Sequence, residues 1–322
     1  MRLLTSSLAK FTENLSTLNQ LKPLKTKFKS IINTARHSFS GIIYAGAVML
    51  IGSSAHAQTL FASNRSVDEN GFYYINEYAA NGGQSTFASG LNNYDYTYGL
   101  AFNSAGDLFA VGGGNILEFT PGGTQSTFAS GVVGSVGENA LAINSAGDLF
   151  TISGNNILEF TPGGSQSTFA SGLNNPSGLA FNSAGDLFTT SGDNILEFTP
   201  GGSQSTFISG TGGEDLAFNS AGDLFAIGGG NILEFTPGGS QSTFASGLTD
   251  AEGLAFNSAG DLFVSEAGPG KILEFAPDGS QSTFASTTFE PTYLAFGPAP
   301  APEPSTLALL AVGAAAFLIR RR

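Results

Sequence analysis

One seven-residue string, Asn-Ser-Ala-Gly-Asp-Leu-Phe, occurs five times in the middle of the chain and restricts the fold more than any other feature. Successive copies are 41, 38, 37 and 38 residues apart, beginning at Asn103, Asn144, Asn182, Asn219 and Asn257. A period near 40 residues is typical of solenoids, propellers and other arrays, in which each repeat packs against its neighbours. The sequence therefore predicts a repeat protein.

Each repeat contains four short apolar runs, of the types Gly-Leu-Ala-Phe, Asp-Leu-Phe, Asn-Ile-Leu-Glu-Phe and Ser-Thr-Phe-Ala. Runs rich in Phe, Ile, Leu and Thr that are bounded by Gly, Pro and Asn predict β-strands joined by hairpin turns. No stretch of this block keeps a helical period. Four antiparallel strands in about 38 residues is the pattern of a propeller blade.

The number of strands predicts how the ring closes. We name the strands a, b, c and d in their order within a repeat, and each type occurs six times. The chain enters at a strand b (Leu60) and leaves after a strand a (294–296), so the last segment supplies the inner strand that the first blade lacks. We therefore expect an all-β, six-bladed β-propeller over residues 58–296, with four antiparallel strands per blade and three-plus-one closure, which leaves no open sheet at the seam.

Because strand direction alternates, the a–b and c–d turns share one face of the predicted ring, which we call the repeated face. Five of its turns carry an aspartate at the same position: Asp107, Asp148, Asp186, Asp223 and Asp261. Each aspartate either accepts hydrogen bonds from nearby backbone N–H groups or belongs to a ring of weak Ca²⁺ contacts. The glutamate in each strand c is expected to be a solvent-facing rim residue.

The d–a and b–c loops share the other face, which we call the variable face because its loops differ from blade to blade. Variation on a rigid scaffold is where recognition is usually found. One loop reads Asn-Asn-Tyr-Asp-Tyr-Thr-Tyr, in which the tyrosines could stack on sugar rings; the alternative is a solvated loop. The candidate ligand-binding residues are Asn92, Asn93, Tyr94, Asp95, Tyr96 and Tyr98.

A second candidate cluster on the variable face lies just before the inner strands, near the expected mouth of the central channel. Its residues are Asn139, Glu214, Asp215 and Glu252. Three carboxylates and an amide are hard oxygen ligands that suit Ca²⁺. They predict a candidate metal site, although nothing in the sequence requires a cofactor.

Charge divides the chain into three parts. Seven of the twelve basic residues lie in the first 40 residues and three end the chain, whereas residues 58–301 carry 23 carboxylates against Arg65 and Lys271, a formal charge of −21. So acidic a block repels phosphate backbones, which argues against nucleic-acid binding. A hydrophobic content of 41% with 28 Phe is enough to bury a core, which excludes charge-driven disorder.

The first 57 residues are typical of an export signal with a long basic n-region. The basic stretch leads into an apolar run of twelve residues, 41–52, and then into Ala55-His56-Ala57, a small-x-small cleavage site. We expect cleavage after Ala57; an uncleaved anchor is the alternative. Both histidines lie in the removed segment and the chain has no cysteine, so histidine bases, Ser-His-Asp triads, cysteine nucleophiles and histidine-ligated zinc are excluded from the mature protein.

The C-terminus carries a second targeting pattern. A Pro-rich linker, residues 297–304, precedes fourteen apolar or small residues, 306–319, and then Arg320, Arg321 and Arg322. Arginines that follow an apolar helix hold the cytoplasmic side of a membrane. Fourteen residues rise about 21 Å as a helix, so snorkelling arginines and local thinning would help this segment, 305–322, to span as a short transmembrane helix.

Pro302-Glu303-Pro304, the apolar segment and the arginine cluster together resemble a PEP-CTERM sorting signal. This resemblance covers about 21 residues. It implies a protein exported across the inner membrane of a Gram-negative bacterium that makes extracellular polysaccharide. It also implies an exosortase that recognises Pro-Glu-Pro and removes the tail. The expected partners are therefore the exosortase, the inner membrane through the C-terminal helix and, outside the cell, polysaccharide.

The repeat, with Gly-Leu-Ala-Phe followed by Gly-Asp-Leu-Phe, resembles NHL-type six-bladed propellers over residues 60–296. This likeness implies a fold and leaves the activity open. We expect a non-enzymatic binding or structural protein of the extracellular polysaccharide matrix. The alternative is a Ca²⁺-dependent, lactonase-like hydrolase, because gluconolactonase-like propellers hold a divalent metal in a comparable channel mouth. Streptogramin-lyase-like propellers need a histidine, which the mature chain lacks.

Overall fold

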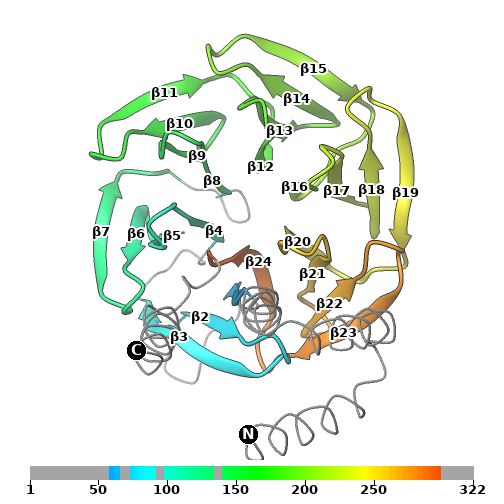
Figure 1. Cartoon of the computed structure of the whole chain (residues 1–322). Helices are drawn as coiled ribbons and strands as arrows, with labels where there is room; N and C mark the ends of the chain where they lie inside the picture. The colour runs from blue at the N-terminus through cyan, green and yellow to red at the C-terminus, as the bar shows by residue number, and fades with distance from the viewer. Residues whose placement is uncertain (1–57, 66–72, 92–97, 134–139, 299–322) are drawn as a thin grey trace, which may run out of the picture. The chain divides into compact units, whose positions relative to one another are not determined.

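A computed structural model describes residues 58–65, 73–91, 98–133 and 140–298. These residues form 24 strands in six four-stranded antiparallel sheets arranged around an axis (Figure 1), so the prediction of an all-β, six-bladed propeller is confirmed. The described parts contain no helix, and hence none long and apolar enough to cross a membrane. The predicted signal segment, 1–57, and C-terminal helix, 305–322, lie outside the described residues.

Each blade runs from an inner strand a to an outer strand d. Blade 1 contains β24 (Pro291–Phe296), β1 (Leu60–Asn64), β2 (Tyr73–Tyr78) and β3 (Gln84–Leu91). Blade 2 contains β4 (Tyr98–Phe102), β5 (Leu108–Gly112), β6 (Asn115–Phe119) and β7 (Gln125–Ser130). Blade 3 contains β8 (Leu141–Ile143), β9 (Leu149–Ser153), β10 (Asn156–Phe160) and β11 (Gln166–Ala170).

The second half of the ring repeats this pattern. Blade 4 contains β12 (Pro176–Phe181), β13 (Leu187–Ser191), β14 (Asn194–Phe198) and β15 (Gln204–Ser209). Blade 5 contains β16 (Leu216–Phe218), β17 (Leu224–Gly228), β18 (Asn231–Phe235) and β19 (Gln241–Ser246). Blade 6 contains β20 (Ala251–Phe256), β21 (Leu262–Glu266), β22 (Lys271–Phe275) and β23 (Gln281–Ser286).

The ring closes in blade 1, where the last strand pairs with the first. Leu60 lies opposite Phe296, Phe61 opposite Ala295 and Ala62 opposite Leu294 in the antiparallel pair of β1 and β24. This is the three-plus-one closure that the order of strand types predicts. Residues 291–296 thus complete the sheet that residues 60–91 begin.

Neighbouring blades are held together by rows of phenylalanines. Between blades 5 and 6, Phe225 packs edge-on against Phe244 at 5.2 Å and against Phe256 at 5.0 Å, and Phe244 packs against Phe275 at 5.8 Å. The same positions meet between the other blades, for example Phe188 with the ring of Phe218 at 5.0 Å. Each such pair contributes about 0.5–1.5 kcal/mol beyond the area it buries, so the repeated Phe positions supply the core.

The residue before the first leucine of each inner strand alternates in size around the ring. Glycine occupies this position in blades 2, 4 and 6, whereas larger residues occupy it in blades 3, 5 and 1; in order around the ring they are Gly99, Ala140, Gly178, Asp215, Gly253 and Tyr293. All three larger residues are buried. The Tyr293 side chain belongs to the hydrophobic cluster of blades 3 and 4, across the axis from its own blade. The axis is therefore filled by side chains at this level.

Blade 1 departs from the repeat on the side that faces blade 6. Asn76 and Tyr78 replace the leucine and phenylalanine of every other strand c, and both are fully buried. Asn64 Oδ1, Asn76 Nδ2 and Tyr78 Oη lack a hydrogen-bond partner among the described residues. Burial raises the pKa of Tyr78 to about 12, and Asn76 opposes that shift. The seam of the ring is thus more polar inside than the other blade interfaces.

Candidate functional site

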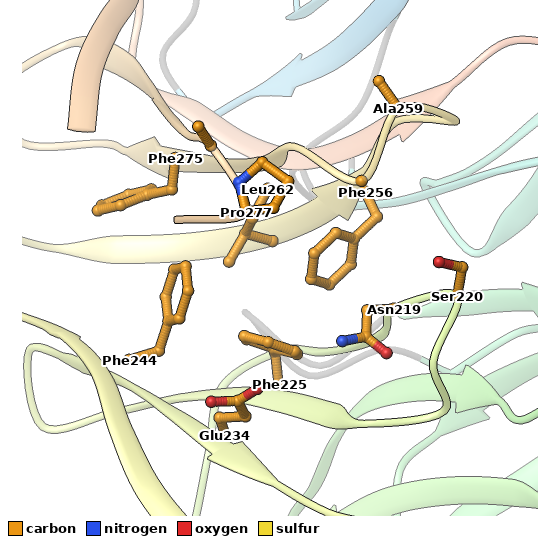
Figure 2. A pocket seen from close by; sticks show the side chains of 12 residues that line it. Asn219, Ser220, Phe225, Glu234, Phe244, Phe256, Ala259, Leu262, Phe275 and Pro277 are labelled. Carbon is orange, nitrogen blue, oxygen red and sulfur yellow. The ribbon is translucent and has the colours of Figure 1, made fainter. Parts of the chain in front are cut away.

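A cavity of about 300 Å³ opens between blades 5 and 6 at the repeated face (Figure 2). Its walls are the four phenylalanines of that interface, and Asn219, Ser220 and Glu234 are its polar lining residues. The Asn219 amide is already bonded to Asp223, and the Glu234 carboxylate accepts a hydrogen bond from Ser242. No nucleophile lies beside a base in this lining, so the cavity is the outward-widening gap between two blades rather than a reactive site.

The aspartates of the repeated face close their own turns, although not in the way that the sequence predicts. In blade 5, Asn219 Oδ1 accepts hydrogen bonds from the N–H groups of Ala221 and Asp223, and its Nδ2 donates to Asp223 Oδ2 at 3.0 Å. The same three bonds occur in all five copies, those that begin at Asn103, Asn144, Asn182, Asn219 and Asn257. The asparagine, not the aspartate, caps the backbone, and the aspartate orients the asparagine.

The glutamates of strand c are half-buried and have partners on the neighbouring strand d. In blades 1 to 5 a serine hydroxyl donates to the glutamate, as Ser126 Oγ does to Glu118 Oε2 at 3.3 Å. The sequence predicts solvent-facing rim residues, whereas these six glutamates are only partly exposed: Glu77, Glu118, Glu159, Glu197, Glu234 and Glu274.

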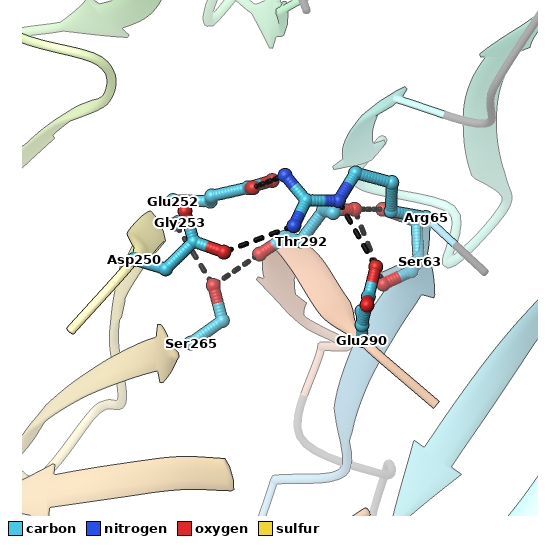
Figure 3. A network of polar contacts seen from close by, with 8 residues as sticks. All are labelled: Ser63, Arg65, Asp250, Glu252, Gly253, Ser265, Glu290 and Thr292. Carbon is cyan, nitrogen blue, oxygen red and sulfur yellow. Dashed lines mark hydrogen bonds and ion pairs between the residues drawn. The ribbon is translucent and has the colours of Figure 1, made fainter. Parts of the chain in front are cut away.

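The main polar cluster lies on the variable face and is organised by Arg65, the residue that follows β1 (Figure 3). Its guanidinium donates from Nη1 to Glu252 Oε1, from Nη2 to Asp250 Oδ2 at 2.9 Å, and from Nε to Glu290 Oε2 at 3.1 Å. The Arg65 N–H also donates to the carbonyl of Glu290. One cation from blade 1 thus joins three carboxylates near the starts of inner strands: Asp250, directly before β20, Glu252 within β20, and Glu290, directly before β24. We call these four residues the Arg65 cluster.

Burial and mutual repulsion set the protonation of the Arg65 cluster. Burial raises the pKa of Glu252 to about 7; Arg65 opposes the shift, and Asp250, Glu214 and Glu290 add to it. Burial also raises the pKa of Glu214, Asp250 adds to that shift, and Arg65 opposes it. Burial disfavours the charged guanidinium, but the three carboxylates still hold its pKa above the usual value. With one cation against three carboxylates, the cluster carries net negative charge at neutral pH.

A chain of hydroxyl groups lies beneath the Arg65 cluster and crosses the seam (Figure 3). The N–H of Gly253 donates to Ser265 Oγ at 2.9 Å, and Ser265 Oγ donates to the carbonyl of Thr292. Thr292 Oγ1 lies 2.8 Å from Ser63 Oγ and also donates to the carbonyl of Ser63. These bonds connect β21 to β24 and β24 to β1, so the floor of the cluster is fixed to both blades.

Asp215 lies next to the cluster but is buried in the ring, with 6% of its surface exposed. Its Oδ2 accepts a hydrogen bond from the N–H of Leu254 in the next blade at 2.8 Å. Burial raises its pKa to about 7; hydrogen bonds from the backbone of Leu254 and Leu216 oppose that shift. A Cβ on Gly178 would lie 3.0 Å from the Asp215 Cα, so glycine at this position lets the backbone of Asp215 approach β12 closely.

The structure brings some of the predicted metal-site residues together and gives them other partners. Glu252 binds Arg65, Asp215 binds backbone, and Asn139 lies outside the described residues. In the described segments no group of three or more His, Cys, Asp or Glu side chains is placed to hold a metal ion. As a four-residue cluster, the metal site remains a prediction.

The predicted sugar-binding loop also remains a prediction. Asn92, Asn93, Tyr94, Asp95 and Tyr96 lie outside the described residues, as do the sorting residues Pro302, Glu303, Pro304, Arg320, Arg321 and Arg322. Of the six predicted residues only Tyr98 is described, and its backbone begins β4 opposite Val111.

Arg65 is the functional residue to which the sequence pattern alone assigns no role. The signal that points to it is its isolation: it is one of two cations among 23 carboxylates over residues 58–301. Its position in the b–c loop of the blade that the C-terminal strand completes adds to that signal. Because a guanidinium presents several donors in a fixed fork, a lone arginine among so many carboxylates can bind more than one of them.

A family model described as the PEP-CTERM protein-sorting motif matches residues 300–322. This finding confirms the resemblance seen in the sequence. The motif indicates an exported, surface-sorted protein with exosortase processing and membrane-anchored sorting, as in Gram-negative bacteria. No match was found among curated proteins.

Several solved structures share the propeller fold at low sequence identity. A chain in the crystal structure of a nidogen/laminin complex has a TM-score of 0.65 at 14% identity, over 76% of this chain and 100% of that one. A virginiamycin B lyase from Staphylococcus aureus has a TM-score of 0.55 at 16% identity, covering 73% and 91%. A gluconolactonase from Xanthomonas campestris has a TM-score of 0.56 at 15% identity, covering 72% and 87%. Since these structures include enzymes and a partner in a complex, they show the fold alone.

Proposed function

We propose that this protein is a non-enzymatic binding protein of the cell surface, and that its variable face binds extracellular polysaccharide. The observation that carries the proposal is the division of the ring into two faces. The turns of the repeated face are nearly identical in five blades and are occupied by their own hydrogen bonds, whereas non-repeated polar loops gather on the other face. Recognition is more easily built from loops that differ than from turns that repeat.

The centre of the variable face supports binding rather than catalysis. Its carboxylates are engaged by Arg65 and its hydroxyls by the seam, so they form a stable floor for the surrounding loops. The predicted mature chain has neither histidine nor cysteine to act as base or nucleophile. The tyrosines of the predicted sugar-binding loop would supply aromatic faces, and such faces stack well on sugar rings.

Binding can be measured with the full chain in detergent, by retention in affinity gels that contain the polysaccharide of the host. We expect Tyr94→Ala with Tyr96→Ala to reduce retention several-fold. Ser183→Ala, an exposed serine on the repeated face, is the matched control and should leave retention unchanged. Equal retention of all three proteins would count against the variable face as the binding surface.

The hydrolase alternative needs a divalent metal at the same mouth, and a metal test separates it from binding. A metal that binds only the folded state raises the melting temperature. A rise at millimolar Ca²⁺ that Glu214→Ala with Glu252→Ala abolishes would favour the lactonase-like function. The engagement of Glu252 by Arg65 leads us to expect no such rise.

A further inference from the structure

The first and last residues of the propeller are bonded to each other. The N–H of Gly297, which directly follows β24, donates to the carbonyl of Thr59 at 2.9 Å. Gln58 Nε2 donates to the carbonyl of Gly297 at 3.2 Å. A Cβ on Gly297 would lie 3.3 Å from the Phe61 ring and 3.5 Å from the Phe102 ring, so this junction packs over blades 1 and 2. The chain therefore enters and leaves the ring at one place.

That place is on the repeated face. Gln58 Oε1 accepts a hydrogen bond at 2.7 Å from the N–H of Ser258, in the a–b turn of blade 6. The ring of Pro298 lies 3.4 Å from where a Cβ on Gly106 would be, in the a–b turn of blade 2. Arg65 and the Arg65 cluster lie at the opposite ends of β1 and β24. Both terminal segments must therefore start from the repeated face, close to the inner strands.

The connection to the sorting motif is short. The motif begins at residue 300, two residues after Pro298, the last described residue, and Pro302 is only four residues beyond Pro298. Four fully extended residues reach at most about 14 Å. The sequence of the linker is rich in proline, from which we expect a semi-rigid spacer. A linker this short should limit how far the propeller can rotate relative to the membrane surface.

We infer that, while the tail is in the membrane, the repeated face of the propeller is turned towards the lipid surface and the sorting enzyme, and the variable face points away. Cleavage of the predicted signal would not alter this orientation, because an uncleaved N-terminal anchor would start from the same face. The inference goes beyond the proposed function, because it holds whatever the variable face binds. It also explains why one face can be uniform: only the other is offered to ligands.

The chemistry of the repeated face suits a surface that is held near lipid without adhering to it. The two basic residues of the described part, Arg65 and Lys271, are both on the variable face, at the end of β1 and the start of β22. The five a–b turns carry aspartates instead, and these would be repelled by anionic headgroups such as phosphatidylglycerol. The tail, not the face, would hold the protein, so that removal of the tail frees it.

Energy transfer between the protein and the membrane tests this orientation. The chain has no cysteine, so Ser220→Cys on the repeated face and Thr249→Cys on the variable face each give a single labelling site at an exposed residue. The full chain would be exported by a Gram-negative host without the sorting enzyme, purified, labelled with a donor and reconstituted in phosphatidylethanolamine/phosphatidylglycerol vesicles with acceptor-labelled headgroups. The two labels should differ in their distance from the membrane by roughly 17–20 Å, the length of a typical strand. We therefore expect energy transfer from the label at Ser220→Cys to be at least about twofold that from the label at Thr249→Cys.

Equal transfer from the two labels, or greater transfer from Thr249→Cys, would overturn the inference. A second variant tests the cause: about 20 Gly/Ser residues inserted after Pro298 form a coil of about 25 Å and should make the two labels alike. If the difference persists, the face itself adheres and the tether does not set the orientation. Neither result depends on polysaccharide, so failure here is distinct from failure of the proposed binding function.

Discussion

The two faces of the propeller are built from the same strands but differ in the span of their interactions. On the repeated face each asparagine bonds to residues two and four positions along the chain, as Asn219 does to Ala221 and Asp223. On the variable face Arg65 bonds to Asp250, Glu252 and Glu290, which are 185, 187 and 225 residues away. Apart from the junction where Gln58 bonds to Gly297 and Ser258, the first face consists of separate local turns, whereas the second has one network across the seam.

This difference predicts which pairs of substitutions should have coupled effects on stability. Residues that share a network have coupled effects on stability, whereas distant, independent sites have additive ones. We therefore expect changes on the repeated face to add and changes on the variable face to depend on one another. Substitutions at the axis, in the Arg65 cluster and in the repeated turns each test this expectation. Their effects on the free energy of unfolding should decrease in this order.

The largest effect is expected for Asp215→Asn and should depend on pH. The pKa of Asp215 is raised from 3.8 to about 7 in the folded state, so the unfolded chain releases this proton more readily. The free energy of unfolding should therefore fall as the pH rises from about 4 to 7, by an upper limit of about 4 kcal/mol at 1.36 kcal/mol per pKa unit. Asparagine keeps an oxygen for Leu254 and has no such dependence.

Urea unfolding of both proteins at pH 5 and pH 8 measures this difference. The variant should gain more stability relative to the natural protein at pH 8 than at pH 5, because only about a third of the loss occurs below pH 5. Glu252 has a raised pKa as well and acts in the same direction, so some pH dependence should remain in the variant. Identical curves for the two proteins at both pH values would show that Asp215 is not the titrating group.

The next effect concerns the axis, where Gly178→Ala should be destabilising by about 2–3 kcal/mol. Gly178 has a φ of +50°, and its new Cβ would lie 3.0 Å from the Asp215 Cα and 3.1 Å from the Leu216 N. Gly172→Ala is the matched control: its φ is +75°, but no atom lies within 4 Å, so only the backbone strain of about 1 kcal/mol applies. Chemical denaturation would compare the two. Equal losses would mean that close packing around the axis contributes nothing.

The fold could be predicted from the sequence because its determinants are repeated. The spacing of apolar runs indicates the strands, and the leftover strand a at residues 294–296 indicates the closure that the pairing of Leu60 with Phe296 confirms. A single short apolar run could belong to a strand or a helix, but six similar runs at a regular spacing all indicate strands. The same reasoning also places the acidic loops before the inner strands on one face.

The partners of those acidic residues could not be predicted, because they depend on contacts between distant loops. The sequence puts Glu252 near Glu214, but which of them meets Arg65 follows from the closure geometry of blades 1 and 6. The filling of the axis by Tyr293 is likewise hidden, since it depends on glycines in alternate blades that look like ordinary turn residues. The predicted role of the repeated aspartates is wrong, because Asn and Asp four residues apart are equivalent as backbone caps until their geometry is known.

A smaller effect is expected for Arg65→Ala, of about 1–2 kcal/mol, because the pairs that it breaks are partly exposed and screened. The loss should come mainly from three carboxylates left near one another. For that reason Arg65→Ala and Glu252→Gln should be non-additive: once Arg65 is gone, neutralising Glu252 should recover stability. A double-mutant cycle from urea unfolding, repeated in 1 M salt, measures this coupling. Additive losses in the cycle would contradict a single network.

The smallest losses of stability are expected for substitutions on the repeated face, where the turns should act independently of one another. Asn219→Ala removes three hydrogen bonds from one exposed turn and should cost about 1 kcal/mol, whereas Asp223→Asn should cost only a few tenths, because an amide oxygen can still accept from Asn219 Nδ2. Asn182→Ala changes the equivalent turn of blade 4, which shares no bond with that of blade 5. The double variant of Asn182 and Asn219 should therefore lose the sum of the two single losses in urea unfolding. A coupling as large as that between Arg65 and Glu252 would mean that the repeated face is also a network, and that the two faces do not differ in the way proposed.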